Sequence, residues 1–257
     1  MNSTSPLGIS KLFALGLAST ITVASADPVP NQGSWESTLH ARDIDRDGVT
    51  DAFFDSALEI TWLANWNTAG PLDWIQAKAW ALSLNVFGVT GWRLPSIFDK
   101  SQVDCSFSGT PNGKCGYNPS PASSELAHMF YVTLGNLARC APNDGNCSSG
   151  EQVGWGLSNT AKFSGMQGYY FLDSEFIPDP LSPSPGLAWS FYAYDGFQGA
   201  ISQHTAIWAV AVKNGDIQPV PEPSTFLLML AGGAIAILKS KRGGEFSVRR
   251  GLALTNG

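Results

Sequence analysis

Hydrophobic positions divide the chain into two apolar terminal runs and a long centre, residues 27–219, in which the spacing of apolar residues changes along the sequence. Residues 52–63 are rich in Phe, Ile, Trp and Thr with partial alternation, which predicts a strand. After Gly150 the same reasoning predicts strands over residues 169–172, 188–194 and 205–212. Four prolines within residues 178–185 predict an irregular loop.

Two amphipathic helices are predicted before these late strands. The first spans residues 71–85, where apolar side chains recur every three or four residues, at Trp74, Ala77, Ala81 and Leu84. The second begins near Ser123, whose hydroxyl can cap a helix, and ends near Gly135. Helices early and strands late, without regular alternation, predict an α+β fold with two helices and a mostly antiparallel sheet.

The N-terminal apolar run has the order of parts of a secretory signal. Lys11 precedes the apolar residues 12–23, and the small residues 24–26 follow them. We therefore expect residues 1–26 to form a signal helix that is removed, so that the mature chain starts near Asp27 outside the cytoplasm. A buried N-terminal helix is the alternative.

The C-terminal apolar run has different flanks. Pro221, Glu222 and Pro223 precede 13 apolar residues at 226–238, and a basic cluster at 239–242 follows. A membrane-spanning helix usually needs ~20 residues. Basic residues that occur only after the run nevertheless agree with a membrane orientation in which the globular part lies outside the cytoplasm. A locally thinned bilayer can accommodate a segment of this length. We expect a transmembrane helix here and a cytoplasmic tail over residues 243–257.

The three-part order over residues 219–242 resembles the PEP-CTERM family of sorting signals. The resemblance implies recognition by exosortase, a membrane-embedded cysteine-type enzyme expected to cleave near Pro-Glu-Pro, in Gram-negative bacteria that make exopolysaccharide. The 15 residues that follow the basic cluster are a departure from the family pattern. Either this tail is carried harmlessly in the cytoplasm or it makes sorting less efficient.

Composition and charge narrow the classes of partner. The chain has 27 Gly, 16 Pro and 9 Trp with only 14% charged residues, which argues against a disordered or coiled-coil protein. Its net charge is −6, but between Asp27 and Leu238 there are 20 acidic and 9 basic residues, a charge of −11. We therefore expect no nucleic-acid partner. Neutral glycans or protein partners are favoured over sulfated or uronate-rich polymers, unless calcium or a local basic patch intervenes.

An acidic turn lies in the lead-in segment, residues 27–51. Its carboxylates come from Asp43, Asp45, Asp47 and Asp51, with Gly48 between them. Carboxylates at alternate positions before a glycine are typical of the start of a calcium loop. The twelfth position, where an EF-hand has Glu, is Phe54. A stabilising Ca²⁺ site and a solvated acidic turn both stay open.

Four cysteines, Cys105, Cys115, Cys140 and Cys147, allow three pairings in an exported chain. Their spacings of ten and seven residues favour two local disulfides, Cys105–Cys115 and Cys140–Cys147. Short closed loops stabilise least, so these disulfides are predicted to fasten loops. A four-thiolate zinc site would need tighter pairs.

No constellation in the sequence indicates an enzyme. The three histidines are far apart, and His128 is expected to be partly buried on the second helix. Nucleophile-elbow, phosphate-loop and dinucleotide-binding motifs are missing. Asp173, Glu175 and Asp179 could supply an acid/base pair for glycoside hydrolysis, although such loop carboxylates usually face solvent.

Aromatic blocks carry a second resemblance. They comprise Trp62-Leu63, Trp-x-x-Ala-x-x-Trp at 74–80, Gly-Trp-Arg-Leu-Pro at 91–95, residues 125–136, and Trp-Ala-Val at 208–210. Over residues 52–216 the chain is similar to the Lcl C-terminal-domain-like family, formerly a domain of unknown function. That resemblance implies a C-type-lectin-like fold and adhesion to polysaccharides such as glycosaminoglycans. Two departures are residues 170–174, where the family has a Tyr-Trp-Ser block, and Ala211, where it commonly has Arg.

Most of these aromatic residues are predicted to pack in the core, with Arg93 tying loop carbonyls together beside a buried Trp92. The Glu-Pro-Asn or Gln-Pro-Asp loop of calcium-dependent lectins is missing, so sugar contact would need exposed rings such as Trp155, Tyr192 or Tyr194. The leading hypothesis is a non-catalytic, exosortase-sorted surface or matrix protein that associates with exopolysaccharide or another glycan. A formylglycine-generating-type enzyme, which would use reactive cysteines, and a purely structural envelope protein are the alternatives.

Overall fold

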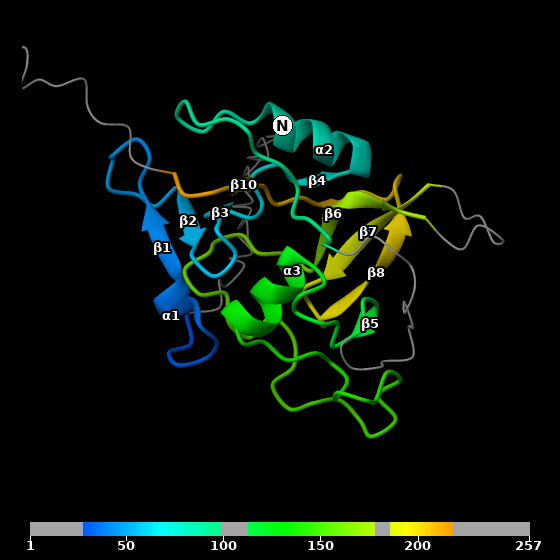
Figure 1. Ribbon diagram of the computed structural model, residues 1–257. Coiled ribbons are helices and arrows are strands. Elements are labelled where there is room, and N and C mark those ends of the chain that lie inside the picture. Colours follow the sequence, from blue (N-terminus) through cyan, green and yellow to red (C-terminus); the bar gives the residue numbers. More distant parts are fainter. Residues whose placement is uncertain (1–27, 99–112, 178–185, 218–257) are drawn as a thin grey trace, which may run out of the picture.

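Strands from both halves of the chain form two sheets (Figure 1). The computed structural model describes residues 28–98, 113–177 and 186–217. The first sheet has the order β1 (Leu39–Arg42), β2 (Ala52–Asp55), β3 (Ile60–Leu63), β10 (Val212–Asn214). The second has the order β4 (Pro71–Leu72), β9 (Ile207–Trp208), β6 (Tyr169–Phe176), β7 (Leu187–Tyr192), β8 (Phe197–Ser202), β5 (Gly116–Tyr117). Within the described residues, β6 and β9 form the one parallel pair of strands.

The two predicted helices are present with shifted ends. Helix α2 (Trp74–Ser83) begins after Asp73, whose side chain accepts from the Gln76 N–H in a capping box. It starts later than predicted because residues 71–72 pair with β9. Helix α3 (Glu125–His128) is capped by Ser124 and continues as a π-helical turn, η1 (Met129–Thr133). A one-turn helix, α1 (Trp35–Thr38), precedes β1.

Successive residues of the central strands point to opposite faces, and both faces are buried. On β6, Tyr170 belongs to a cluster that includes α3, whereas Phe171 belongs to a cluster that includes α2. The α3 side holds large rings such as Trp62 and Trp189. The α2 side is rich in alanine, which lets the helix approach the strands closely. The helices therefore lie on opposite sides of the strands (Figure 1).

The strand predictions differ from the structure where local turns interrupt the pattern. Residues 52–63 form the hairpin β2–β3, since the buried Asp55 carboxylate accepts from the N–H groups of Ala57 and Leu58 and fixes a turn. Residues 205–212 contribute to β9 and β10, in different sheets. Strand β8 was not predicted, because Gly199 and Ala200 in its middle have low strand propensity.

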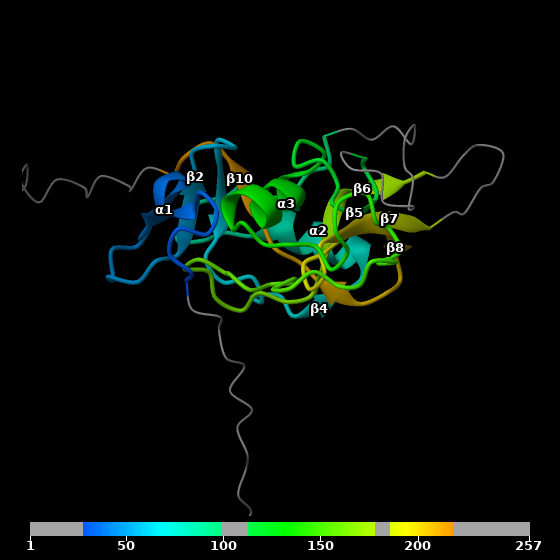
Figure 2. The ribbon, with the colours of Figure 1, turned by 90° about the horizontal axis from the view of Figure 1, so that it is seen from below.

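The segment predicted as a lead-in, residues 27–51, is integrated into the fold from residue 28 onward. It supplies α1 and β1, and Trp35 is a core residue. Gly33 and Gly135 have positive φ angles and cross closely: a Cβ on Gly33 would lie 2.4 Å from the Thr133 carbonyl oxygen. In the view from below, the loops of residues 134–168 extend between α1 and the side of β5 and β8 (Figure 2). Buried Asn159 fastens them there by donating to the Gln32 carbonyl.

The prediction of a mixed, mostly antiparallel fold is confirmed. As predicted, Trp74 and Trp92 are buried, whereas Trp80 and Trp208 are half-buried. A search of the described residues finds no helix with the length and apolarity needed to cross a bilayer. The expected signal helix, sorting signal, transmembrane helix, tail and 178–185 loop lie outside the described residues, as do Cys105 and Asp179.

Candidate functional site

Four aromatic side chains lie side by side across one end of the second sheet. Tyr169 of β6 pairs with Tyr192 of β7, Tyr192 pairs with Phe197 of β8, and Phe197 pairs with Tyr117 of β5. Their ring centroids are 4.8, 5.3 and 5.1 Å apart in that order. Directly opposed residues of antiparallel strands share a face, so one ring from each strand builds a transverse row.

Two rings from loops lengthen this row. Tyr194, just after β7, lies 5.3 Å from Tyr169, and Trp155 lies 6.5 Å from Tyr194 between ring centroids. We call the six rings the aromatic row: Tyr117, Phe197, Tyr192, Tyr169, Tyr194 and Trp155. Tyr194 is 39% exposed, and the other five rings are half-buried. Of the three rings predicted to be exposed, only Tyr194 is, because Trp155 and Tyr192 are half-buried by their ring neighbours. All three belong to one surface.

The aromatic row and α2 occupy the same face of the sheet at different places along the strands. Tyr192 shares its face with Ala188, four residues away, which packs in the cluster that contains α2. Tyr169 likewise packs against the edge of that cluster. The ten-residue helix thus covers one end of this face, and half-buried rings form the other.

Charged groups border the aromatic row, and each is engaged with another protein group. Arg139 pairs with Glu151 at 2.7 Å, and its guanidinium carbon lies 5.8 Å from the Trp155 ring centroid. The Trp155 indole N–H donates to Glu151 at 3.1 Å. Asp195 is almost fully buried and accepts from the Tyr117 hydroxyl at 3.2 Å. Burial raises the pKa of the Asp195 carboxyl above its usual value.

A disulfide fastens the loop that brings Arg139, Glu151 and Trp155 to the row. Cys140 is bonded to Cys147, and the Cys140 carbonyl accepts from Gln152 at 2.9 Å. The structure therefore pairs these cysteines as the spacing predicted. Cys115 is also disulfide-bonded, while its predicted partner lies outside the described residues.

The acidic turn joins β1 to β2 and brings together three of its four aspartates. Asp43, Asp45 and Asp51 each offer a carboxylate oxygen, and these oxygens lie within 4.8 Å of one another. Asp47 is outside this group, and its carboxylate accepts from the Val49 N–H. Burial, with the Asp45 and Asp43 charges, raises the pKa of the Asp51 carboxyl. The carboxylates repel one another at this distance, and a bound hard cation such as Ca²⁺ would reduce that repulsion.

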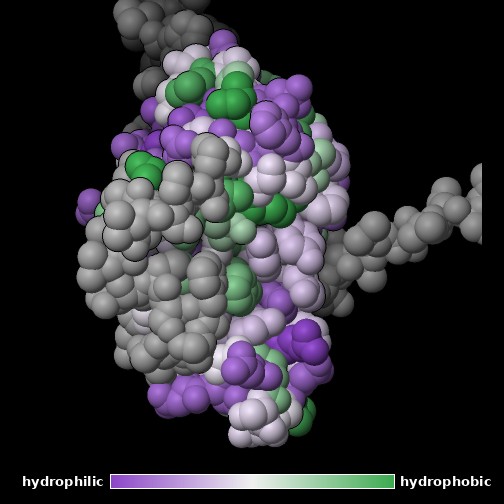
Figure 3. Space-filling view, turned by 90° about the vertical axis from the view of Figure 1, so that its right-hand side faces the viewer, coloured by the Kyte–Doolittle hydropathy of each residue, from purple (hydrophilic) through white to green (hydrophobic). Residues whose placement is uncertain are grey.

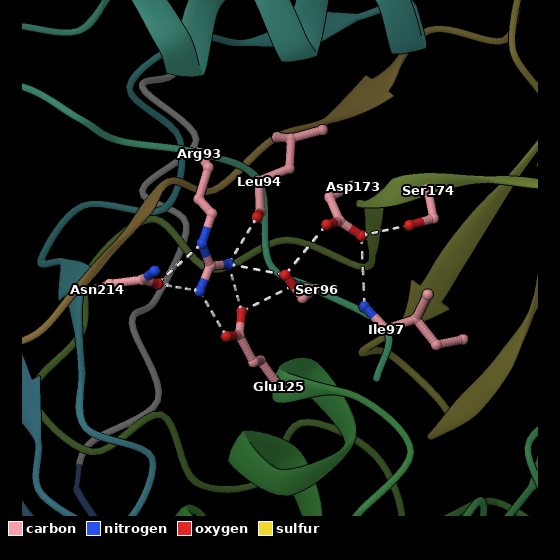
Figure 4. A network of polar contacts seen from close by, with 8 residues as sticks. All are labelled: Arg93, Leu94, Ser96, Ile97, Glu125, Asp173, Ser174 and Asn214. Carbon is pink, nitrogen blue, oxygen red and sulfur yellow. Dashed lines mark hydrogen bonds and ion pairs between the residues drawn. The ribbon is translucent and has the colours of Figure 1, made fainter. Parts of the chain in front are cut away.

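The Trp-Arg-Leu-Pro block leads into a polar network that holds four segments together (Figure 4). Arg93 makes a bidentate pair with Glu125 of α3, at 2.8 and 2.7 Å. As predicted, it also donates to a loop carbonyl, that of Leu94, and it reaches Asn214 of β10. Ser96 donates to Asp173 of β6 at 3.1 Å. Glu125 is buried and Arg93 is only partly exposed, so the network stabilises the packing of these segments against one another.

The other sequence-derived candidates are dispersed. Asp173 accepts hydrogen bonds within the Arg93 network, and Glu175 is exposed and contacts Gln203. His128 is half-buried, as predicted, and burial lowers its pKa. The further members of the aromatic row, Tyr117, Tyr169 and Phe197, were missed in the sequence, since only cross-strand register brings them together.

Exposed hydrophobic side chains also lie elsewhere on the described surface. On the face shown in Figure 3, hydrophobic residues form small patches between hydrophilic ones. Examples on other elements are Ile75 and Leu82 of α2 and Phe87 in the following loop. Scattered apolar side chains are normal on protein surfaces, so they indicate no site.

Comparison with protein families matches the PEP-CTERM protein-sorting motif to residues 219–242. The chain therefore carries the sorting signal of exosortase-processed proteins, which implies export to the cell envelope. Comparison with curated proteins gave no match, and comparison with solved structures gave none either. The resemblance of residues 52–216 to the Lcl C-terminal-domain-like family, and with it the lectin-like fold, stays a prediction.

Proposed function

We propose that this exported protein is a non-catalytic component of the cell surface or extracellular matrix that associates with exopolysaccharide or a similar glycan. The observation that carries the proposal is the aromatic row, a continuous set of partly exposed rings on a face that α2 leaves open. Tyr and Trp combine an apolar ring with a polar group, so they can contact a partner that has both apolar and hydrated surfaces. The sorting motif supplies the route to such a partner.

Membrane attachment before processing completes the proposal. The apolar run at 226–238, followed by basic residues, would hold the chain in the inner membrane until exosortase cuts near Pro221–Pro223. Intact-mass measurement of the protein from its producing cells tests this step. A mass ending near residue 223 is expected, and an uncut C-terminus reaching Gly257 would contradict it.

Retention on the producer's own exopolysaccharide tests the glycan association. The mature protein secreted by the producing cells is incubated with washed exopolysaccharide, and the bound fraction is compared with that of heat-denatured protein. We expect retention several times that of the denatured control. Equal retention of both would exclude the binding role and leave a structural role in the envelope.

The competing enzyme proposal, a formylglycine-generating-type activity, requires reactive thiols. Thiol titration of the secreted protein under denaturing conditions separates the two proposals. The non-catalytic proposal expects no free thiol, in keeping with the bonded Cys140 and Cys147 and the bonded Cys115. Two titratable thiols would favour the enzyme.

A second proposal concerns the acidic turn, where we propose that Ca²⁺ binds and stabilises the β1–β2 connection. Asp43, Asp45 and Asp51 converge there, and one Asp43 carboxylate oxygen is buried with no hydrogen-bond partner among the described residues. Few ligands and an exposed loop suggest a dissociation constant of about 10⁻⁴ to 10⁻³ M, as in extracellular modules.

Calorimetric titration of the full chain with CaCl₂ tests this proposal. Asp45→Asn combined with Asp51→Asn should remove the binding heat, because two of the three converging carboxylates lose their charge. Asp47→Asn is the matched control, since Asp47 lies in the same turn but outside the group. No heat at about 10 mM CaCl₂, well above the expected range, or loss in the control alone, would overturn the site.

A further inference from the structure

We propose that the aromatic row binds chains of neutral pyranose sugars, so that it is the surface through which the protein holds its polysaccharide. The inference rests on the proposed glycan association and adds to it a site and a class of sugar. Acidic polymers, and a second copy of this chain, are the competing occupants that the test below separates.

The arrangement of the rings suits an extended chain of sugar rings. Four rings stand on four neighbouring strands at centroid spacings of 4.8 to 5.3 Å, and Tyr194 and Trp155 continue the row beyond the sheet. A pyranose ring has apolar C–H faces surrounded by hydroxyl groups. Such rings can therefore lie against aromatic carbons while their hydroxyls meet the polar ends of the tyrosines.

The most exposed ring is held in place by the backbone. The Tyr194 N–H donates to the Gly168 carbonyl at 3.2 Å. A Cβ on Gly168 would lie 3.3 Å from the Tyr194 Cβ, and one on Gly156 would lie 2.9 Å from the Tyr194 carbonyl oxygen. The two glycines thus leave room for Tyr194 on both sides. A ring positioned before binding loses less conformational freedom when a ligand arrives.

The charges next to the row favour uncharged sugars. The Arg139 guanidinium is already paired with Glu151, so it offers little net positive charge to an anion. The Asp195 carboxylate lies beneath the Tyr117 hydroxyl. A uronate or sulfate group on the row would therefore gain little from this ion pair, and the Asp195 carboxylate would repel it. The charge of −11 between Asp27 and Leu238 acts in the same direction.

Affinity electrophoresis of the full chain in native gels tests the inference. The gels contain a neutral polymer, namely hydroxyethyl cellulose, galactomannan or dextran, or else alginate, a uronate polymer. The test variant combines Trp155→Ala with Tyr194→Ala, and Tyr194→Phe keeps the ring while removing its hydroxyl. Phe98→Ala is the matched control, because Phe98 is a 53% exposed aromatic residue outside the row.

The expected result is slower migration of the wild type in at least one neutral gel but not in alginate. The double variant should bind at least about tenfold more weakly, because it removes two of the six rings, and aromatic anchors carry much of the binding energy of interfaces. Tyr194→Phe should stay within about threefold, and Phe98→Ala should match the wild type. Thermal unfolding of each variant separates loss of binding from loss of fold.

Other results overturn the inference in distinguishable ways. Two results would show that the row does not bind neutral sugars: retardation in the alginate gel alone, or equal retardation of the wild type and the double variant in the neutral gels. The proposed function would still stand if exopolysaccharide retained the protein. Lack of retardation in every neutral gel would overturn the sugar class. A dimer in size-exclusion chromatography that the double variant abolishes would instead assign the row to a second copy. Binding to neutral polymer without retention on the producer's exopolysaccharide would overturn the proposed function alone.

Discussion

The two ends of one sheet face are built from different residues on the same strands. On β7, Ala188 packs beneath the α2 cluster and is fully buried, while Tyr192, four residues further along the same face, is half-buried in the aromatic row. At the covered end small side chains let a helix approach. At the open end large rings stay partly exposed although they contact one another. The difference indicates that contacts at the covered end stabilise the fold, whereas the rings at the open end keep exposed surface that a partner can contact.

The largest expected effect comes from a tryptophan at the covered end. Trp74 is buried on α2, and its indole N–H donates to the Leu172 carbonyl at 2.9 Å. Trp74→Ala should lower the free energy of unfolding by roughly 3–5 kcal/mol, through lost burial and a cavity. Trp155→Ala, at the open end, should cost less than about 1 kcal/mol because that ring is half-buried on the surface. Urea denaturation measures both, and equal costs would remove the distinction between the two ends.

The disulfide beside the row should have the next largest effect. Replacing both Cys140 and Cys147 by Ser opens a short loop, for which the chain-entropy argument gives a loss of about 2 kcal/mol. The loss should be local, because the loop lies against the row and not in either core cluster. Amide hydrogen exchange should therefore rise at residues 139–156 and stay unchanged in α2. Uniformly faster exchange would show instead that the loop is part of the global folding unit.

These contrasts also show what the sequence could predict. The repeat of Trp74, Ala77 and Ala81 identified α2, because helical periodicity is local information. The aromatic row needed strand register: Tyr117 and Phe197 are 80 positions apart and meet only through β5–β8 pairing. Strand β1 lies in the segment that was predicted only as a lead-in with an acidic turn. Local pattern therefore predicts elements, whereas long-range pairing assembles the candidate site.

A smaller effect should come from the buried carboxylate beneath the row. Asp195 has a raised pKa in the folded protein because burial disfavours its charge. The protonated carboxyl therefore contributes stability that is fully present below the unfolded pKa near 3.8. This contribution is lost as the pH rises through the pKa of the folded protein. Asp195→Asn removes this titration, so the stability of the wild type relative to the variant should fall as the pH rises above about 4. Denaturation at several pH values measures the difference, with exposed Asp47→Asn as control. A difference independent of pH would contradict it.

The smallest effect on stability should accompany a clear effect on the row. A Cβ at Gly168 would lie 3.3 Å from the Tyr194 Cβ, a contact that a small shift of Tyr194 relieves. Gly168→Ala should therefore cost only about 0.5 kcal/mol while displacing Tyr194 from Trp155, which near-ultraviolet circular dichroism detects. Gly186→Ala is the opposite control: Gly186 has a φ of +84° in open space, so alanine there is strained but touches nothing near the row. It should lose about 1 kcal/mol with an unchanged aromatic spectrum. If both variants changed stability and spectrum together, the row would be coupled to the rest of the sheet and could not be treated as a separate surface.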